Sequence, residues 1–404
     1  MPRLPPMAPG RKRARAPLEF ATLAVHAGSD LPPPRTPPLG LPIHRTSSYR
    51  FASSAEVRRY GRGERGGLYL YSRYENPTVR AVERRLAALE GAEEGLLFST
   101  GMAAITTALL AHLSAGETLL ASSELYGGTH RLLRDELPRL GIGVELRSSA
   151  DLLRGLWPKR VKVVYTESPT NPSLRLIDLA RLSSRARDAG AILIVDGTFA
   201  TPVLQRPLAL GADLVIHSAT KALGGHSDLL AGAVLGGRAR LLPVERLRRA
   251  FGGTLAPDEA YLLGRSLETL PLRVARQSAT AAELARRLER DRRVFRVLYP
   301  GLRSHPDHRL ALRQMPGFGG MVTLELAGGL RAARRLFDRL ELIARATSLG
   351  GTESLASLPV ESSHAGFGAA ALAGAGVTRG MVRLSIGLEG VEDLWHDLDR
   401  ALGG

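Results

Sequence analysis

A lysine and an aspartate follow two short apolar segments and could act on one ligand. Asp196 comes directly after the first segment, and Lys221 follows the second one in a run that also holds Ser218 and Thr220. A primary amine forms a Schiff base with an aldehyde, and a carboxylate keeps a pyridine nitrogen protonated. Hydroxyl groups beside the lysine can bind a phosphate. This combination of residue types predicts a site for pyridoxal 5′-phosphate (PLP), with Lys221 holding the cofactor.

Two glycine-containing turns offer further groups to such a ligand. In Ser99-Thr-Gly-Met-Ala103, Gly101 lets the backbone approach a phosphate, and the free N–H groups of the helix that follows would face it. Tyr126 opens the second turn, Tyr126-Gly-Gly-Thr129, and offers an aromatic face for stacking on a cofactor ring. Taken alone, the first turn also fits an ordinary helix N-cap and the second a packed tyrosine. Both interpretations stay open at this point.

The elements that would position these residues alternate between helix and strand from about residue 76. Short apolar runs, separated by helical segments with one apolar face, indicate a mostly parallel sheet with helices on both faces. The strands are expected over 96–98, 118–120, 161–165, 191–195 and 214–216, and the helices over 76–91, 102–113, 129–140 and 178–189. Ligands of such sheets bind at the carboxyl ends of the strands, where Asp196 and Lys221 stand.

The same pattern divides the chain into four segments. Residues 1–17 hold five basic residues and no acidic one, so we expect a disordered basic tail. Residues 18–70 would form an N-terminal arm, extended where it is rich in proline. Residues 71–256 would be the cofactor-binding large domain, and residues 257–404 a bridging helix and a smaller C-terminal domain. In this last segment we expect one long helix over 257–291, strands over 321–326 and 381–386, and a final helix over 391–402.

Composition limits the other classes of function. The 404 residues include 55 Lys+Arg and 39 Asp+Glu, a formal charge of +16, but only four of the basic residues are lysines. Such an arginine excess is typical of a GC-rich genome and is spread along the chain, so a basic nucleic-acid-binding protein is kept only as a hypothesis from another class. The absence of cysteine excludes disulfides, thiolate metal ligands and a cysteine nucleophile, and the sequence indicates no metal site. No apolar run is long enough to cross a membrane, and we expect a cytoplasmic protein.

Eight stretches in order along the chain are similar to motifs of one enzyme family. They are Tyr71-Ser-Arg-Tyr-Glu-Asn-Pro-Thr78, Ser99-Thr-Gly-Met-Ala-Ala104, Tyr126-Gly-Gly-Thr129, Glu167-Ser-Pro-Thr-Asn-Pro172, Val195-Asp-Gly-Thr-Phe-Ala-Thr-Pro202, His217-Ser-Ala-Thr-Lys221 with Gly224-Gly-His-Ser-Asp228, Ser348-Leu-Gly-Gly351 and Val382-Arg-Leu-Ser-Ile-Gly-Leu-Glu389. The chain thus resembles the PLP-dependent enzymes of Cys/Met metabolism, the transsulfuration family. The resemblance implies an α/β fold like that of aspartate aminotransferase (PLP fold type I), with a mostly parallel seven-stranded sheet in the large domain and a smaller C-terminal α/β domain.

The resemblance also implies a role for each candidate residue around the cofactor ring. Lys221 would hold PLP and then move protons, and Asp196 would pair with the pyridinium nitrogen. Tyr126 would stack on the ring and assist proton transfer. Asn171 would lie near the phenolic oxygen of the cofactor.

Other residues would bind the phosphate and the substrate. The phosphate ligands implied within one subunit are Gly101, Met102, Ser218 and Thr220. Tyr71 and Arg73 would reach the phosphate of the neighbouring subunit, which implies a homodimer as the catalytic unit and favours a homotetramer. Arg383 would bind the substrate carboxylate in a bidentate pair, with Ser348 helping to orient it.

The motifs favour a reaction at Cγ of a sulfur amino acid. We expect an α,γ-elimination like that of cystathionine γ-lyase, which releases a thiol, ammonia and a 2-oxo acid. Replacement at Cγ of an O-acylhomoserine, as in cystathionine γ-synthase or a sulfhydrylase, and a methionine γ-lyase are the alternatives, and a lapsed relative that only binds cofactor is another. Four positions depart from the usual motifs: Gly197, where asparagine is common; Ala222, where an aromatic often follows the lysine; Thr347, where the cystathionine γ-enzymes typically have glutamate; and Gly128, where methionine γ-lyases usually have cysteine.

Overall fold

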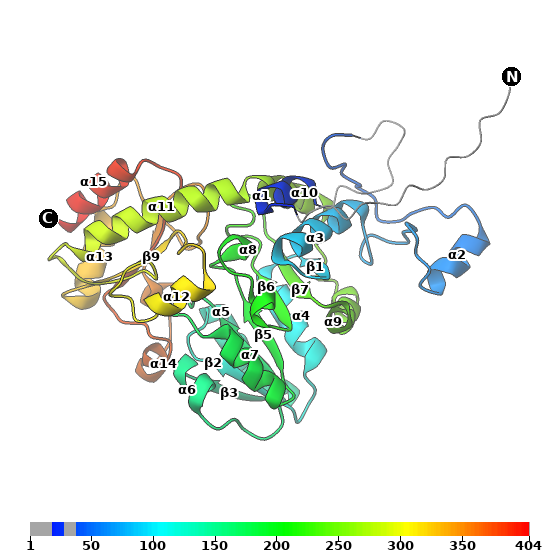
Figure 1. Ribbon diagram of the computed structural model, residues 1–404, viewed down its shortest axis with the longest axis horizontal. Coiled ribbons are helices and arrows are strands. Elements are labelled where there is room, and N and C mark those ends of the chain that lie inside the picture. The colour runs from blue at the N-terminus through cyan, green and yellow to red at the C-terminus, as the bar shows by residue number, and fades with distance from the viewer. Residues whose placement is uncertain (1–17, 28–37, 404) are drawn as a thin grey trace.

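The computed structural model describes residues 18–27 and 38–403, and it contains two β-sheets with helices packed on them (Figure 1). The larger sheet has seven strands in the order β1-β7-β6-β5-β4-β2-β3. Six of them run parallel to one another, and β7 pairs antiparallel with both β1 and β6. The strands are β1 (Glu94–Phe98), β2 (Thr118–Ser122), β3 (Gly143–Arg147), β4 (Val161–Glu167), β5 (Ile192–Asp196), β6 (Leu214–His217) and β7 (Gly232–Gly236). The predicted mostly parallel seven-stranded sheet is confirmed.

Side-chain alternation along the strands builds one core on each face of this sheet. Ile192 and Ile194 of β5 belong to the core beneath α4 and α9, whereas Leu193 and Val195 of the same strand belong to the core beneath α7. The helices up to the end of this sheet region are α1 (Phe20–His26), α2 (Ser54–Gly61), α3 (Pro77–Glu90), α4 (Gly101–His112), α5 (Gly127–Arg131), α6 (Ser149–Arg154), α7 (Leu179–Asp188), α8 (Thr201–Leu204) and α9 (Arg238–Phe251). Both faces are therefore buried, which explains why the strands read as continuous apolar runs.

The second sheet has five strands in the order β10-β11-β12-β9-β8 and is covered by α11, α13 and α15. Its strands are β8 (Val294–Leu298), β9 (Met321–Leu326), β10 (Ala344–Arg345), β11 (Leu355–Ser357) and β12 (Met381–Ser385). The helices of this part are α10 (Pro257–Glu268), α11 (Leu270–Glu289), α12 (His308–Gln314), α13 (Gly329–Arg339), α14 (Ala369–Gly374) and α15 (Val391–Leu402). Figure 1 shows α11 running along one side of the molecule from the first sheet toward the second.

Several predicted elements differ from those observed. The expected single helix over 257–291 is two helices, because α10 ends before Thr269 and α11 begins after it with proline in its first turn. The expected helix over 129–140 changes from α5 into a π-turn over Leu132–Glu136 and a 3₁₀ turn over Pro138–Leu140, at the point where Pro138 can donate no hydrogen bond. Strands β3 and β7 were not predicted, since β3 is half-exposed and β7 is rich in glycine.

Most boundaries near the site agree with the expectation. Asn76 caps α3 and Gly91 ends it in a left-handed conformation, as predicted from the Asn-Pro start and the glycine stop. The basic tail and most of the proline-rich stretch lie outside the described residues. The division of the chain at residue 257 stays a prediction.

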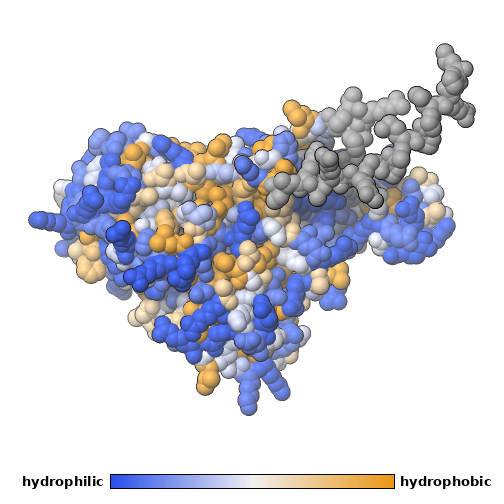
Figure 2. Space-filling model, viewed as in Figure 1, coloured by the Kyte–Doolittle hydropathy of each residue, from blue (hydrophilic) through white to orange (hydrophobic). Residues whose placement is uncertain are grey.

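On the face that Figure 2 shows, hydrophilic residues are not confined to one side. In Figure 2 they are spread over the whole visible face and are interrupted by smaller hydrophobic patches. Among the described helices, none combines the length and the apolar character needed to cross a bilayer.

Candidate active site

Lys221 meets residues from the second sheet. Its Nζ donates a hydrogen bond to the Ser348 hydroxyl at 2.9 Å. The Ser348 carbonyl accepts from Nη2 of Arg383 at 3.1 Å, and Nη1 of Arg383 donates to Asn171 Oδ1 at 3.0 Å. Four predicted site residues separated by up to 212 positions thus lie in one chain of hydrogen bonds.

The backbone after β6 explains the position of Lys221. Residues 218–224 form a helix-like turn, in which the Lys221 N–H donates to the Ser218 carbonyl at 3.1 Å and the Gly224 N–H to the Ala219 carbonyl at 2.8 Å. The turn carries the amine away from the sheet toward Ser348. Burial, followed by the positive charge of Arg383, lowers the pKa of Lys221 from its ordinary value. A larger share of neutral amine is therefore present near neutral pH than for an exposed lysine.

Arg383 is a buried cation on β12 with 6% of its surface exposed. No carboxylate of the described residues pairs with it, and its Nε has no hydrogen-bond partner among them. Burial lowers its pKa to about 10. Because a buried, incompletely bonded guanidinium is costly, this side chain is well suited to bind an incoming carboxylate.

Asp196 ends β5 at the carboxyl edge of the large sheet. Its Oδ1 accepts from the Thr198 N–H at 2.9 Å, and its Oδ2 accepts from the Tyr165 hydroxyl at 3.3 Å. Burial raises the pKa of Asp196. A cation placed beside this carboxylate would reverse that effect and be stabilised by it.

Glu167 lies beside Asp196 on the neighbouring strand and was given no role in the sequence analysis. The two residues are partners in the register of β4 and β5. Glu167 Oε1 accepts from the Tyr126 N–H at 2.7 Å, so this carboxyl group fixes the turn that carries Tyr126. Burial, and then the charge of Asp196, raises the pKa of Glu167 well above its ordinary value.

The two turns predicted to hold a phosphate lie against each other. A Cβ at Gly101 would stand 2.8 Å from Cβ of Ser218, so only glycine allows the start of α4 to approach the Lys221 turn this closely. Thr100 caps α4, and Met102 is the second residue of that helix. Thr220 is engaged elsewhere: its hydroxyl donates to the Ala231 carbonyl at 3.2 Å and accepts from the Ala231 N–H at 2.9 Å. Its hydrogen must turn away from Ala231 before it can donate to a phosphate.

Tyr126 is 42% exposed and follows β2 at the same edge of the sheet. Its ring lies against Gly128, where an added Cβ would overlap Cε1 of the tyrosine and stand 3.1 Å from Cζ. A side chain at position 128 would therefore displace the tyrosine ring.

Tyr71 and Arg73 lie apart from the Lys221 cluster within one chain. Arg73 donates to the Arg249 carbonyl at 2.5 Å, and its guanidinium lies 5.7 Å from the centre of the Tyr71 ring. Both side chains are exposed, and Arg73 lines a surface cavity of about 700 Å³ together with residues of α9. The segment that precedes them, with α2, stands away from the body of the molecule in Figure 1.

Three further residues support the site. The Thr198 hydroxyl accepts from the Ser218 N–H at 2.8 Å. Thr198 could have been found from the sequence, because it stands in an Asp-Gly-Thr motif at the end of a strand. His217 is fully buried and pairs with Glu90 at 2.9 Å, beneath Gly197, where a Cβ would stand 2.9 Å from the imidazole Cε1. No local motif connects Glu90 with His217, so this pair could not be predicted from the sequence.

Comparison with known proteins identifies relatives over almost the whole chain. The family model described as Cys/Met metabolism PLP-dependent enzyme matches residues 21–403. L-methionine γ-lyase of Pseudomonas putida is 41% identical over 95% of this chain and 97% of its own, and chloroplastic cystathionine γ-synthase 1 of Nicotiana tabacum is 40% identical over 94% and 71%. The structure of cystathionine γ-lyase from Lactobacillus plantarum, complexed with L-serine, superimposes with a TM-score of 0.88 at 34% identity and covers 95% of this chain and 98% of that one.

Proposed function

The chain belongs to the Cys/Met metabolism PLP-dependent enzymes, and on this premise we propose that it eliminates a thiol from Cγ of a sulfur amino acid. The products would be the thiol, ammonia and a 2-oxo acid. The observation that carries the proposal is the contact of Lys221 Nζ with Ser348 Oγ at 2.9 Å, beside the incompletely bonded guanidinium of Arg383. A base and a carboxylate-binding group thus lie next to each other.

Enzymes of this family use PLP, and the residues around Lys221 fit that cofactor. Gly101 lets the start of α4 lie close to Ser218, so that both could contact one phosphate. Asp196 is a buried carboxylate suited to a pyridinium nitrogen, and the Tyr126 ring is exposed and open to stacking. When bound, PLP supplies an electron sink for the charge that proton removal leaves on the substrate Cα.

We assign the following work to the side chains. Arg383 binds the substrate carboxylate through its guanidinium fork, and Ser348 orients it. Lys221 then accepts the Cα proton at Nζ, for which its lowered pKa prepares it, and returns a proton later in the reaction. To the Tyr126 hydroxyl we assign the transfer of a proton as the thiol leaves Cγ.

The residue at position 128 helps to choose between two proposed activities, those of a cystathionine γ-lyase and a methionine γ-lyase. Methionine γ-lyases usually have cysteine there, and in this chain a side chain at 128 would overlap the Tyr126 ring. We therefore favour an elimination like that of cystathionine γ-lyase over a methionine γ-lyase.

A second candidate is replacement at Cγ of an O-acylhomoserine. Thr347 is exposed beside Ser348 and presents no carboxylate where the cystathionine γ-enzymes typically have glutamate. A substrate with a neutral acyl group at its distal end would fit such a position better than one with a distal ammonium group.

The catalytic unit we propose is a homodimer in the cytoplasm, assembled further into a homotetramer. Support comes from Tyr71 and Arg73, which lie exposed and apart from Lys221 in one chain. In the dimer they would reach the phosphate of the neighbouring subunit.

The test is a panel of cystathionine, methionine, cysteine, homocysteine and O-acylhomoserines, with thiol, ammonia and 2-oxo acid followed for each. A four-carbon 2-oxo acid formed together with a thiol supports elimination at Cγ. A three-carbon 2-oxo acid from cystathionine would instead indicate cleavage at Cβ. Turnover of only the O-acylhomoserines, in the presence of a thiol, would establish the second candidate.

A further inference from the structure

Arg273 is a buried cation behind the Lys221 turn. It is 4% exposed and lies in the first turns of α11, and among the residues that the structure describes no carboxylate pairs with it. Burial lowers its pKa to about 10. A buried guanidinium without a counter-charge is expensive, and a neutral side chain could fill the same space.

The guanidinium of Arg273 bonds the backbone of the Lys221 turn. It donates to the carbonyls of Ala222 at 2.8 Å and Leu223 at 3.5 Å, and on its other side to the Ser266 carbonyl at 2.8 Å. The Ala222 and Leu223 carbonyls end the helix-like turn and would otherwise be buried without a hydrogen-bond donor. Gly225 adopts a left-handed conformation directly against the guanidinium, where any Cβ would overlap it. The turn and the arginine therefore fit each other closely.

Gln277 lies one helical turn farther along α11 and is 3% exposed. Residues four positions apart share a helix face. Its Nε2 donates to the Gly351 carbonyl at 2.7 Å, at the end of the loop that carries Ser348. The same loop is bonded from its other side, where the Gly350 N–H donates to the Ser385 hydroxyl at 2.8 Å.

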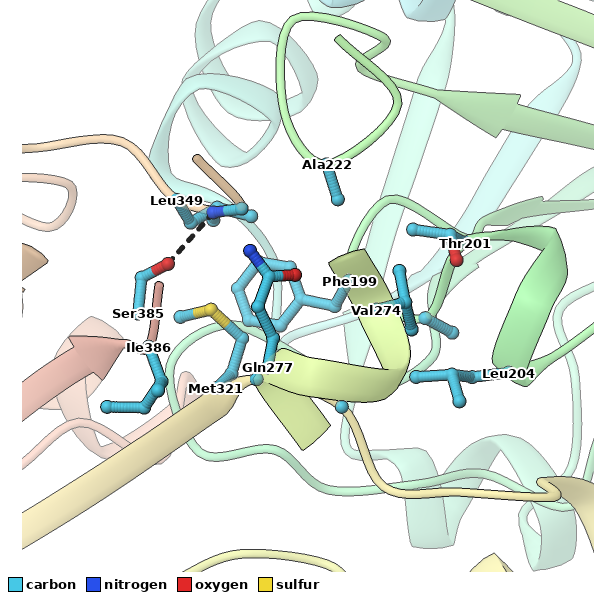
Figure 3. A pocket seen from close by; sticks show the side chains of 14 residues that line it. Phe199, Thr201, Leu204, Ala222, Val274, Gln277, Met321, Leu349, Ser385 and Ile386 are labelled. Carbon is cyan, nitrogen blue, oxygen red and sulfur yellow. Dashed lines mark hydrogen bonds between the residues drawn. The ribbon is translucent and has the colours of Figure 1, made fainter. Parts of the chain in front are cut away.

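The two loops and α11 meet around a small cavity, shown in Figure 3. Its volume is about 20 Å³, room for about one water molecule, and Ala222, Gln277, Leu349 and Ser385 are among its lining residues. In Figure 3 the Gln277 side chain extends from α11 toward the space between Ala222 on one loop and Leu349 on the other. Beside this cavity, α11 is joined to the Lys221 turn by the hydrogen bond from Arg273 and to the Ser348 loop by the hydrogen bond from Gln277.

We propose that Arg273 and Gln277 are positioning residues, which fasten the Lys221 turn and the Ser348 loop to one face of α11. The helix thereby sets the separation of the amine that moves the substrate proton and the hydroxyl that orients the substrate carboxylate. The inference deepens the proposed function and rests on it for the role of these two groups. It requires two contacts, each with its own consequence: Arg273 acts on the amine, and Gln277 acts on the carboxylate site.

The first test measures the state of the Lys221 amine without requiring turnover. The full-length protein, freed of cofactor, is acetylated with trace acetic anhydride over a range of pH, and each lysine peptide is quantified by mass spectrometry. Lys159 and Lys162, both exposed, serve as internal references in the same sample. Arg273→Lys keeps the charge and removes the guanidinium fork. We expect its Lys221 profile to move up by about one pH unit, because the released amine gains water.

Controls separate positioning from charge and from folding. Arg276→Lys makes the same change on the exposed side of α11, where Arg276 donates to the Glu389 carbonyl, and should leave the Lys221 profile in place. An Arg273→Lys profile equal to that of the unmodified protein would overturn the assignment of Arg273, whatever happens to its melting temperature.

The second variant tests the carboxylate side independently of the first. Gln277→Leu is similar in volume but cannot donate to Gly351, and we expect KM for the amino-acid substrate to rise about tenfold with kcat changed less than about twofold. A fall in kcat at constant KM, or no change in either, would overturn the assignment of Gln277. Should Arg273→Lys fail to fold, this variant decides the proposal. Should no sulfur amino acid react, the acetylation profiles still report on Arg273, so failure of the proposed function and failure of the inference are distinguishable.

Discussion

At the scale of single residues, Arg383 carries the clearest prediction. Its guanidinium is buried and only partly bonded within the chain, so a substrate carboxylate would complete its hydrogen bonds. Arg383→Lys keeps a positive charge but loses the fork that binds a carboxylate through two parallel bonds. We expect kcat/KM to fall about 100-fold, which corresponds to about 3 kcal/mol, with most of the loss in KM. Steady-state kinetics of the holoenzyme measure this, and an unchanged KM would contradict the role.

Gly101 makes a second prediction at this scale. In Gly101→Ala the new methyl group would press on Ser218, and the start of α4 would have to move away from the Lys221 turn. We expect PLP to bind at least about tenfold more weakly, because the N–H groups that we propose as phosphate ligands would be displaced. Gly40→Ala is the matched control, since a Cβ there meets nothing within 4 Å. Equal PLP affinities of the two variants, measured by fluorescence titration, would exclude a phosphate-binding role for the start of α4.

The candidate site was predictable where its residues stand in short motifs at strand ends. Lys221, Ser218 and Asp196 are of this kind, because a polar residue directly after an apolar strand is visible in the sequence. Glu167 lies within a quoted motif, but its contact with the Tyr126 backbone requires two strands to be in register. Arg273 is one arginine among 51 in the chain. Only the fold reveals that it is buried behind the lysine.

At the scale of elements, the start of α3 joins the N-terminal arm to the large sheet. Asn76 Oδ1 caps the helix through the Thr78 N–H at 2.9 Å, and its Nδ2 donates to the His44 carbonyl at 2.8 Å and to the Tyr49 and Ser72 hydroxyls at 3.1 Å. Asn76→Ala should lower the free energy of unfolding by about 3 kcal/mol, because the cap and a buried polar network are lost together.

Two comparison variants interpret that loss. Asn76→Asp keeps the cap but not the donors and should lie between Asn76→Ala and the unmodified protein. Ser53→Ala removes the exposed cap of α2 and should cost about 0.5 kcal/mol. Chemical denaturation gives all three values. Equal losses for Asn76→Ala and Ser53→Ala would contradict a stabilising contribution of the Asn76 hydrogen bonds beyond the helix cap.

Elements were predictable where pattern and end signals agree. The helix α3 has a capping asparagine, a proline in its first turn and a glycine stop, and β5 and β6 are compact apolar runs. The strand β7 has glycine at both ends, and its place between β1 and β6 depends on contacts distant in sequence. The break at Thr269 was missed because the apolar pattern continues through it, although Pro271 follows closely.

At the scale of the whole molecule, two buried histidines lie where the parts bearing the two sheets meet. His364 lies against the Leu125 carbonyl at 3.2 Å, and His305 against the Ser173 backbone. Burial lowers the pKa of each to about 4, whereas an unfolded histidine has a pKa of about 6.5. Between these values the unfolded chain binds more protons than the folded chain, so stability is full above about pH 6.5 and is lost as pH falls toward 4.

We expect each histidine to contribute about 3 kcal/mol to that loss. His305→Gln and His364→Gln should each flatten the fall of the melting temperature between pH 6.5 and pH 4. His396→Gln, which changes a histidine on α15, is the control and should leave the slope as it is. A slope that neither buried-site variant alters would assign the acid sensitivity to other groups.

Attachment of the cofactor to Lys221 is the assignment on which the proposed function depends. Borohydride reduction of the holoenzyme fixes PLP on its lysine, and the chain offers only Lys12, Lys159, Lys162 and Lys221 as alternatives. Peptide mass mapping of the reduced protein should find the added pyridoxyl phosphate mass on Lys221 alone, and on no lysine in Lys221→Ala. The added mass on any of the other three lysines, or on no lysine in a protein that turns over substrate, would contradict the assignment of Lys221.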